Sequence, residues 1–354
     1  MGEEMKDLSL LVTGAGAPGF PGITKALRKN GERNIRIVAT DMKPDVVGYY
    51  LADAHYQVPP GDVPSYIDEM LKIVEKEKID VVLPLCTNEL LPLARNVKRF
   101  EEIGAKVLVS KPESLEIAIN KGKLYSYLKG EFVPEFYIAK TVEEFEEAAE
   151  RLGYPEKPFV FKPTISHGSR GFRIVMPNVD RKKILFEQKP TNVYASYDEI
   201  IKVLEDGGFP ELVVMEYLPG DEYSIDMVGK DGDTIYTVPR KRVEIKQGIS
   251  YTGIIEKNEE LIEASNEVYR QLKLDYNINM QFKKSLDGTF KIIEINPRVS
   301  GSLIFCVGAG VNLPYFGVKL LLGEEIPKVE IKWGTRVYRH WEEIFVYNDS
   351  IFRI

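Results

Sequence analysis

The chain has little cysteine and no excess of basic residues, and each shortage excludes a class of protein. Only Cys86 and Cys306 are cysteines among 354 residues, and they form no Cys-x-x-Cys pair, so neither a disulfide framework nor a thiolate metal site is expected. The formal net charge is -7, which argues against a general nucleic-acid binder because phosphate backbones are bound by clustered Lys and Arg. A reducing cytoplasm is the expected location.

Long apolar runs and targeting signals are lacking too. The most apolar stretch, 303–323, is interrupted by Asn312, Pro314 and Lys319, which favours a buried loop and helix over a membrane span. The N-terminus is acidic and lacks the basic start and apolar run of a signal peptide. We therefore expect a soluble, folded protein with no membrane partner.

What the sequence does contain is an alternation of short apolar runs with helical patterns up to residue 112, followed by strand-rich sequence. This order predicts an α/β and α+β fold that begins with a parallel α/β domain. The expected divisions are a Rossmann-like domain at 1–112, connecting helices at 113–130, a small α+β module at 131–215 and a strand-dominated part at 216–354. Two capping boxes, Thr141 with Glu144 and Ser196 with Glu199, predict helix starts within the small module.

A glycine-rich turn follows the first predicted strand. Residues 14–19 match G-x-G-x-x-G, and Asp41 follows the next strand, as in dinucleotide-binding folds. The alternative is a tight turn that packs helix on strand without any nicotinamide. The second interpretation is favoured, because His55, His167 and His340 lie in no context that suits hydride transfer.

The segment that is most informative about function runs from 279 to 298. Asp287-Gly288 predicts a two-residue type I′ hairpin turn. That turn would place Gln281 opposite Glu294 and Asn279 opposite Asn296, so that four oxygen-bearing side chains share one face. The other face would enter a core, with Ile278, Met280, Phe282, Ile293 and Ile295.

One carboxylate and several amide oxygens, with Arg298 just beyond, would suit a hard cation and a polyphosphate. An ordinary hairpin with one solvated face is the alternative. Upstream, Lys162 ends an apolar strand before the small glycine-containing loop 166–171, a pattern that suits phosphate binding or a flexible hairpin tip.

Two further segments have open interpretations. Residues 212–226 predict two strands around Pro219-Gly220, where exposed backbone could bind the edge of an adenine and Glu222 could accept from ribose hydroxyls; a plain hairpin is the alternative. The run 240–242 is either a solvated strand end or a clamp for an anion.

In this order, the segments resemble the ATP-grasp superfamily, and most closely one synthetase half of the carbamoyl-phosphate synthase large subunit. Asn296-Pro297-Arg298-Val299-Ser300 carries the likeness most directly, and the resemblance covers nearly the whole chain. It implies a pre-ATP-grasp domain followed by a two-part ATP-grasp fold with a mobile lid. The chain departs from the synthase in having one such half and no nucleophile motif for glutamine.

The resemblance also implies site residues. For ATP phosphates it implies Lys123 and Lys162, with the lid loop Ser166, His167, Gly168, Ser169, Arg170 and Gly171. For adenine and ribose it implies Glu216, Tyr217, Leu218 and Glu222. For the metal it implies Gln281, Glu294 and Asn296, with Arg298 and Lys162 as catalytic residues. For the substrate it implies Glu89, Arg240, Arg242 and Ser300.

The implied activity is that of a Mg-ATP-dependent ligase that joins a carboxylate to an amine through an acyl phosphate. The expected cofactors are ATP and Mg²⁺, with Mn²⁺ as an alternative ion. The expected partners are small carboxylates and amines, and a homodimer is left open. The competing hypotheses are a bicarbonate-activating enzyme like the synthase, an ATP-binding protein without catalysis, and an NAD-dependent dehydrogenase.

Overall fold

The computed structural model describes residues 5–166, 170–177, 180, 182, 186, 187, 193–246, 248–348 and 350–352. The chain folds into two units. Unit 1 consists of Met1–Glu116, Tyr223–Gln281 and Ile295–Ile354, and unit 2 consists of Ile117–Glu222 and Phe282–Glu294.

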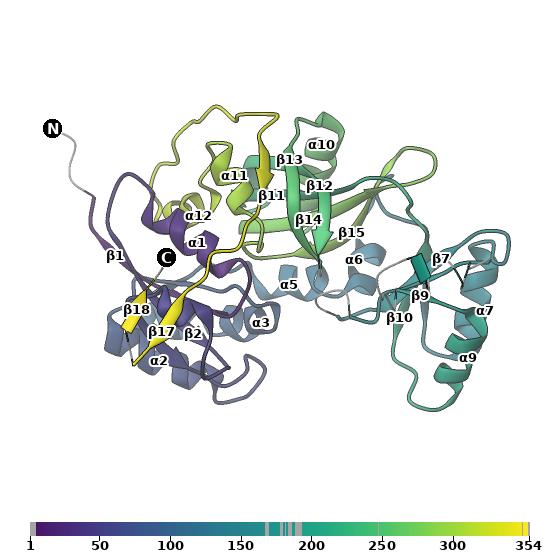
Figure 1. The fold of residues 1–354 in the computed structure, drawn as a ribbon, viewed down its shortest axis with the longest axis horizontal. Helices are drawn as coiled ribbons and strands as arrows, with labels where there is room; N and C mark the ends of the chain where they lie inside the picture. The colour runs from purple at the N-terminus through teal and green to yellow at the C-terminus, as the bar shows by residue number, and fades with distance from the viewer. Residues whose placement is uncertain are drawn as a thin grey trace. The chain divides into compact units, whose positions relative to one another are not determined.

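Unit 1 begins with a five-stranded parallel sheet of order β3-β2-β1-β4-β5 (Figure 1). Its strands are β1 (Leu8–Val12), β2 (Ile35–Asp41), β3 (Ala54–Gln57), β4 (Val81–Leu83) and β5 (Lys106–Val107). Leu10 of the central strand pairs with Ile37 on one side and with Val81 on the other. The parallel α/β domain that the sequence predicts is therefore present.

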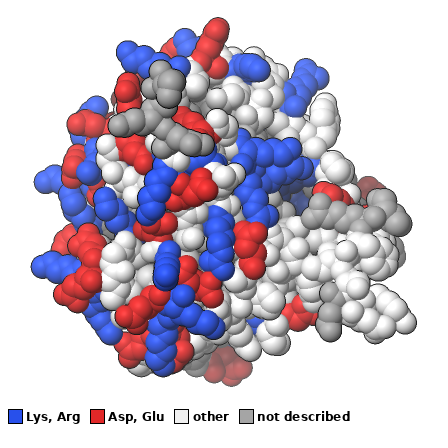
Figure 2. Space-filling model, turned by 90° about the vertical axis from the view of Figure 1, so that its left-hand side faces the viewer, with Lys and Arg blue, Asp and Glu red and all other residues white. Residues whose placement is uncertain are grey.

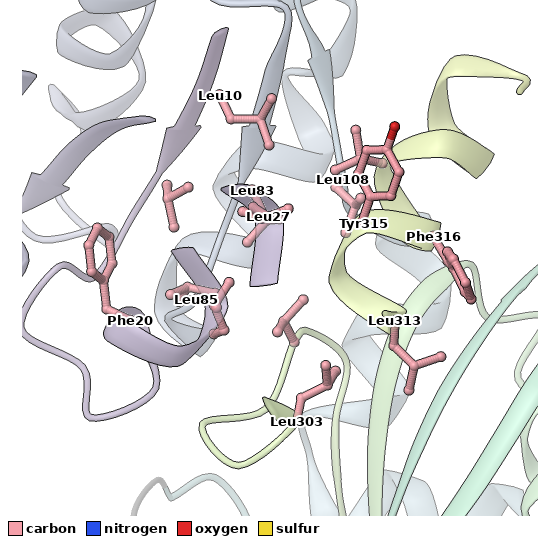
Figure 3. Close-up of a cluster of buried hydrophobic side chains, with 14 of the residues drawn as sticks. Leu10, Phe20, Leu27, Leu83, Leu85, Leu108, Leu303, Leu313, Tyr315 and Phe316 are labelled. Atoms are coloured by element: carbon pink, nitrogen blue, oxygen red, sulfur yellow. The ribbon is translucent and has the colours of Figure 1, made fainter. Parts of the chain in front are cut away.

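Helices cover both faces of this sheet, which explains why its strands read as continuous apolar runs. They are α1 (Phe20–Arg28), α2 (Tyr66–Glu77), α3 (Thr87–Arg95), α4 (Val97–Glu102) and α12 (Leu313–Leu322), with the short η1 (Val47–Tyr50) and α5 (Pro112–Ala118) nearby in the chain. Because side chains alternate along a strand, Leu10 enters one core and Leu11 the other. Figure 3 shows the first core, where Leu10 lies among side chains that include Leu27 of α1 and Tyr315 of α12.

The second large sheet has the order β15-β14-β11-β12-β13-β16. Its strands are β11 (Glu222–Lys230), β12 (Asp233–Lys246), β13 (Ile249–Ile255), β14 (Tyr276–Lys284), β15 (Phe290–Asn296) and β16 (Arg336–Tyr338). The helices α10 (Glu259–Gln271) and α11 (Ile304–Gly308) and the hairpin of β17 (Phe345–Tyr347) and β18 (Ser350–Phe352) complete this part of the chain. The predicted loop and helix at 303–323 correspond to α11 and α12.

Unit 2 contains a sheet of order β6-β10-β7-β8-β9. Its strands are β6 (Phe136–Ala139), β7 (Phe159–Pro163), β8 (Arg173–Val175), β9 (Tyr194–Ala195) and β10 (Leu212–Glu216), and its helices include α6 (Lys121–Tyr127), α7 (Val142–Arg151) and α9 (Tyr197–Glu205) (Figure 1). Thr141 caps α7 and Ser196 caps α9 through a full capping box, as the sequence predicts. Phe145 of α7 then packs edge-on against Phe159 and Phe161 of β7.

The turn of the β14–β15 hairpin differs from the prediction. Ser285 N donates to Thr289 O at 2.8 Å and Gly288 N donates to Ser285 O at 3.2 Å, so the loop holds three residues, 286–288, and the predicted two-residue turn is wrong. Gly288 has a φ of 92°, and the Asp287 carboxylate accepts from Thr289 N, which favours the longer loop. At the loop the pairing is therefore one residue out of the predicted register.

The burial pattern of the hairpin differs from the prediction as well. Four of the expected core residues are buried: Ile278, Met280, Phe282 and Ile295. Ile293 is only half-buried, and so is the neighbouring Glu294, so the strict alternation breaks at this point of β15. The prediction that Ile293 lies in the core is wrong, and its backbone carbonyl has another role, described below.

The surface mixes charges of both signs. Figure 2 shows basic and acidic side chains interspersed on the face that it draws. Exposed ion pairs such as Arg28–Asp53 and Arg99–Asp68, each at 2.7 Å, illustrate this mixing within unit 1. Among the described residues, no helix has both the length and the apolar character that crossing a membrane requires.

Candidate active site

Lys162 is a buried lysine at the end of an apolar strand. It lies on β7 of unit 2 with 7% of its surface exposed, and its Nζ donates to Ile293 O at 2.7 Å and to Tyr125 Oη at 3.1 Å. Burial, and to a smaller extent the charge of Lys121, lower the pKa of Lys162 to about 7, while Glu294 and Glu222 oppose the shift. The half-buried Ile293 thus offers its carbonyl to the ammonium group that the sequence singles out.

A second buried lysine, Lys121, lies in the same cluster. It is the first residue of α6, it is 6% exposed, and its Nζ donates to Ser166 O at 3.0 Å and to Ser166 Oγ at 3.3 Å. Burial lowers the pKa of Lys121, and the charge of Glu294 partly offsets that effect. Two ammonium groups and a carboxylate are therefore collected in unit 2.

Lys123, by contrast, has an exposed side chain, although it is only two residues further along the same helix. Two residues correspond to about 200° of rotation around a helix, so the two lysines point in opposite directions. Sequence reasoning named Lys123 and missed Lys121. The available signal was the i, i+4 spacing of Lys121 and Tyr125, which places both on the buried face of α6.

The predicted lid loop is described only in part. Ser166 is half-buried and Arg170 is exposed, while His167, Gly168 and Ser169 lie outside the described residues. Gly171 has a φ of 75°, and a Cβ at that position would lie 2.6 Å from Pro163 Cδ, so the backbone there requires glycine. This end of the loop therefore packs closely on the end of β7.

The predicted adenine and ribose residues run from the last residue of β10, Glu216, to the first residue of β11, Glu222. The Glu216 carboxylate accepts from Glu135 N at 2.9 Å, Leu218 is buried, and Tyr217 is half-buried with the Lys283 ammonium 5.9 Å from its ring centre. The turn after them is fixed by Gly220 N, which donates to Lys284 O at 2.9 Å. Glu222, the first residue of β11, is close enough to Lys162 to raise the pKa of that lysine.

The predicted metal residues lie on β14 and β15, which are neighbours in the second sheet. In unit 1, Arg298 Nη2 donates to Asn296 Oδ1 at 3.2 Å, and Arg298 Nε donates to Thr87 Oγ1 at 3.2 Å. Glu294 lies two residues before Asn296 on β15. Carboxylate and amide oxygens are the ligand types that Mg²⁺ prefers, so the chemistry of these three side chains fits the predicted role.

The predicted substrate arginines lie on β12. Arg242 Nη1 donates to Gln281 Oε1 at 3.3 Å, and Arg242 Nε donates to Ser250 Oγ at 3.0 Å. Arg240 Nη2 donates to Ser300 Oγ at 3.3 Å. The structure therefore brings together, within unit 1, both arginines, Ser300 and Gln281.

Glu89 is a buried carboxylate near the carboxyl ends of β1 and β4. Thr13 Oγ1 donates to it, and the same hydroxyl accepts from Leu85 N at 3.0 Å. Burial raises the pKa of Glu89 to about 7, against the lowering effects of the Thr13 hydrogen bond and of the Arg298 charge. The carboxyl end of a parallel sheet is where such folds place ligand groups.

The glycine-rich turn is filled by protein. The Asp41 carboxylate accepts from Gly16 N at 2.7 Å, and a Cβ on Gly19 would lie 2.5 Å from the Cα of Gly301. The start of α1 thus lies directly against the backbone of the 300–302 segment. These contacts favour the interpretation as a tight packing turn over a nicotinamide site.

Two known families match separate parts of the chain. Residues 208–342 match the family "ATP-grasp in the biosynthetic pathway with Ter operon", and residues 10–108 match the "PylC-like, N-terminal domain" family. The chain carries an ATP-grasp domain behind a PylC-like N-terminal domain. The ATP-grasp resemblance that the sequence suggests is thereby confirmed.

Individual relatives support this assignment. This chain is 25% identical over 323 residues to the carbamoyl phosphate synthase arginine-specific large chain of Halalkalibacterium halodurans. The match covers 86% of this chain but only 28% of that relative's length.

Two solved structures show the same fold. One is the N5-carboxyaminoimidazole synthetase of Staphylococcus aureus complexed with ADP, with a TM-score of 0.68 at 17% identity, covering 93% of this chain and 81% of that one. The other is the biotin carboxylase domain of the Hydrogenobacter thermophilus 2-oxoglutarate carboxylase in complex with MgADP, ADP and bicarbonate. It has a TM-score of 0.67 at 17% identity, covering 94% of this chain and 74% of that one. The expected combination of α/β and ATP-grasp architecture is confirmed.

Proposed function

We propose that the protein is a Mg-ATP-dependent ligase that joins a carboxylate to an amine and releases ADP and phosphate. The observation that carries this proposal is the cluster of Lys121, Lys162 and Glu294 in unit 2 of an ATP-grasp chain. Two buried ammonium groups close to each other are costly in an ordinary core. A bound polyphosphate would relieve that cost, since charge-assisted hydrogen bonds to its oxygens compensate both lysines.

The nucleotide residues differ from the sequence prediction by one lysine. The buried Lys121 takes the place of the exposed Lys123 beside Lys162 as a phosphate-binding residue, and the loop Ser166–Gly171 stays a predicted contact. Glu216, Tyr217 and Leu218 would bind adenine, and Glu222 would accept from ribose hydroxyls.

Gln281, Glu294 and Asn296 would hold Mg²⁺, and Mn²⁺ is the alternative ion. A bound ion of this kind neutralises charge on the phosphates. The hydrogen bond from Arg242 fixes the orientation of the Gln281 amide, and that from Arg298 does the same for Asn296. These two arginines thereby keep amide oxygens in a defined position.

The reaction would proceed in two displacements. A carboxylate oxygen of the first substrate attacks the γ-phosphorus of ATP, the bond to the bridging oxygen breaks, and ADP leaves. The amine nitrogen of the second substrate then attacks the acyl carbon and displaces phosphate, losing a proton. Arg298 and Lys162 would hold the charge on the transferred group, and loss of such a preorganised group costs roughly 100- to 1,000-fold in rate.

The substrates would be bound by Glu89, Arg240, Arg242 and Ser300. The arginines suit a carboxylate. Bicarbonate is a second candidate for that carboxylate. A relative of the chain is a carbamoyl phosphate synthase, and a structure of the same fold contains bicarbonate. The bicarbonate-activating alternative therefore belongs in any screen of substrates.

The test is ADP release from Mg-ATP by the purified protein, against pooled carboxylates and amines with bicarbonate included. We expect release that depends on one pool and is abolished by Glu294→Ala. Glu260→Ala, which removes an exposed carboxylate from α10, is the matched control and should keep full activity. ATP binding without release under any pool would favour an ATP-binding protein without catalysis.

A further inference from the structure

A row of polar side chains, all of them in unit 1, is buried across the second large sheet. Strand β11 lies between β14 and β12, and the row runs over these three strands and β13: Asn279, Ser224, Asp226, Arg240, Arg242 and Ser250. Asp226 is fully buried and Arg240 is 1% exposed. Polar groups are rarely buried in such numbers unless they are fully hydrogen-bonded and serve a purpose beyond packing.

Besides the weak thiol donor Cys306 Sγ at 3.6 Å, Asp226 holds three partners at once. Its carboxylate accepts from Arg240 Nε at 2.7 Å, from Ser300 Oγ at 2.8 Å and from Asn279 Nδ2 at 2.8 Å. These partners come from β12, from the segment after β15 and from β14. One carboxylate therefore fixes side chains from three separate parts of the unit.

Every nitrogen of the Arg240 guanidinium is used by the protein. Nε bonds to Asp226, Nη1 donates to Ser250 Oγ at 3.0 Å, and Nη2 donates to Ser300 Oγ at 3.3 Å. The guanidinium also lies over the Phe305 ring, 5.5 Å from its centre. Since only 1% of its surface is exposed, Arg240 is poorly placed to contact a substrate.

The network continues from Arg240 to the more exposed Arg242. Ser250 Oγ accepts from both Arg240 Nη1 and Arg242 Nε, so one hydroxyl connects the two guanidinium groups. Arg242 is 8% exposed, its Nη1 donates to Gln281 Oε1, and its Nη2 donates to Gly248 O at 2.6 Å. Ser250 is therefore one of the groups that orient Arg242, and it is the one through which Arg240 and Asp226 act.

We propose that Asp226 and Arg240 form a positioning pair that orients Arg242 and Ser300 toward a substrate carboxylate, and that Arg240 itself does not contact the substrate. This inference rests on the proposed function, in which these residues bind a carboxylate, and it gives Arg240 a positioning role in place of direct contact. A buried ion pair is a weak source of stability, because an apolar pair of similar volume is often as good or better. A contribution to stability therefore does not explain why this ion pair is present.

The experiment uses the double variant Asp226→Leu with Arg240→Met, which removes both charges together and leaves no unpaired buried charge. Its control is Arg33→Met with Glu324→Leu, another ion pair of unit 1 in which the Arg33 side chain is 2% exposed. Thermal unfolding shows that each variant folds, and calorimetric titration measures binding of ATP and, separately, of acetate, bicarbonate and inorganic phosphate.

We expect the Asp226–Arg240 variant to bind ATP as the parent does and to bind the most tightly held of the three anions at least about tenfold more weakly, the effect of losing one charge-assisted hydrogen bond. The control should bind both ligands like the parent. Once a substrate is known, the same variant should raise its KM with little change in the KM for ATP.

Unchanged anion affinity in a folded double variant would overturn the proposal, and so would a parent protein that binds none of the three anions. Neither result bears on the ligase itself, since ADP release and ATP binding test that separately.

Discussion

The ammonium group of Lys162 donates a hydrogen bond of 2.7 Å to the backbone carbonyl of Ile293. This contact joins the apolar strand β7 to the point on β15 where the burial pattern breaks, one residue before Glu294. A lysine held in this way keeps a fixed position while its charge is only partly compensated. That is the arrangement on which a phosphate-binding role depends.

Lys121→Met should weaken ATP binding by about 10- to 100-fold, whereas Lys123→Met should leave it unchanged. Lys121 is buried in the cluster with Lys162, and a charged hydrogen bond is worth roughly this factor. Lys123 is exposed on the other side of the same helix. Calorimetric titration with ATP compares the two, and equal losses in both variants would contradict the assignment.

Binding of ATP should take up a proton above pH 7. The pKa of Lys162 is about 7 in the free protein, so the side chain is mostly neutral at pH 8. Phosphate charge favours the ammonium form and raises this pKa, so protein and nucleotide together gain up to one proton. The affinity should therefore fall as the pH rises from 7.5 to 9, by up to about tenfold per pH unit.

Titrations in buffers of different ionisation enthalpy measure this proton uptake directly. Lys162→Met should abolish both the uptake and the pH slope, while Lys123→Met should keep both. A pH-independent affinity in the parent protein would show that Lys162 does not meet the phosphates.

Several features of the fold and of the candidate site can be predicted from the local sequence. The parallel sheet follows from apolar runs that are buried on both faces, and the capped starts of α7 and α9 follow from Thr141 and Ser196. Lys162 could be singled out because a lysine among Phe159, Val160 and Phe161 conflicts with its surroundings unless it is paired. In each case the decisive information lies within a few residues.

The remaining features depend on residues that are far apart in the sequence or on the detailed geometry of a turn. Asp226 looks like any residue of a strand until Arg240, Ser300 and Asn279 come to it from 14, 74 and 53 residues away. The Asp287-Gly288 dipeptide suits a two-residue and a three-residue loop alike, and hydrogen bonds to Asp287 decide for the longer one. The choice of Lys121 over Lys123 required the phase of a seven-residue helix.

Gly19→Ala should destabilise the protein by about 1–3 kcal/mol, the usual cost of overpacking. The added Cβ would lie 2.5 Å from the Cα of Gly301, and backbone atoms cannot move aside as a flexible side chain can. Gly308→Ala is the matched control, because a Cβ there meets nothing within 4 Å. Urea unfolding measures both, and equal free energies of unfolding would show that the turn has room to spare for a ligand.

The stability of the protein should depend on Glu89 between about pH 4.5 and 7. The folded state holds the Glu89 proton up to a pKa of about 7, whereas the ordinary value is 4.5. Because the folded state binds more protons in this window, the free energy of unfolding contributed by Glu89 falls as the pH rises through it. Glu89→Gln removes the ionisation while leaving a side-chain oxygen able to accept from Thr13.

The variant should therefore gain stability over the parent as the pH is raised from 4.5 to 8, with most of the gain complete near pH 7. Urea unfolding of both proteins at several pH values measures the difference. Glu102→Gln, an exposed change on α4, is the control for the general effect of removing a negative charge. A difference between Glu89→Gln and the parent that is the same at pH 4.5 and pH 8 would show that the Glu89 carboxylate is solvated or paired, and would remove it from the set of buried groups available to a substrate.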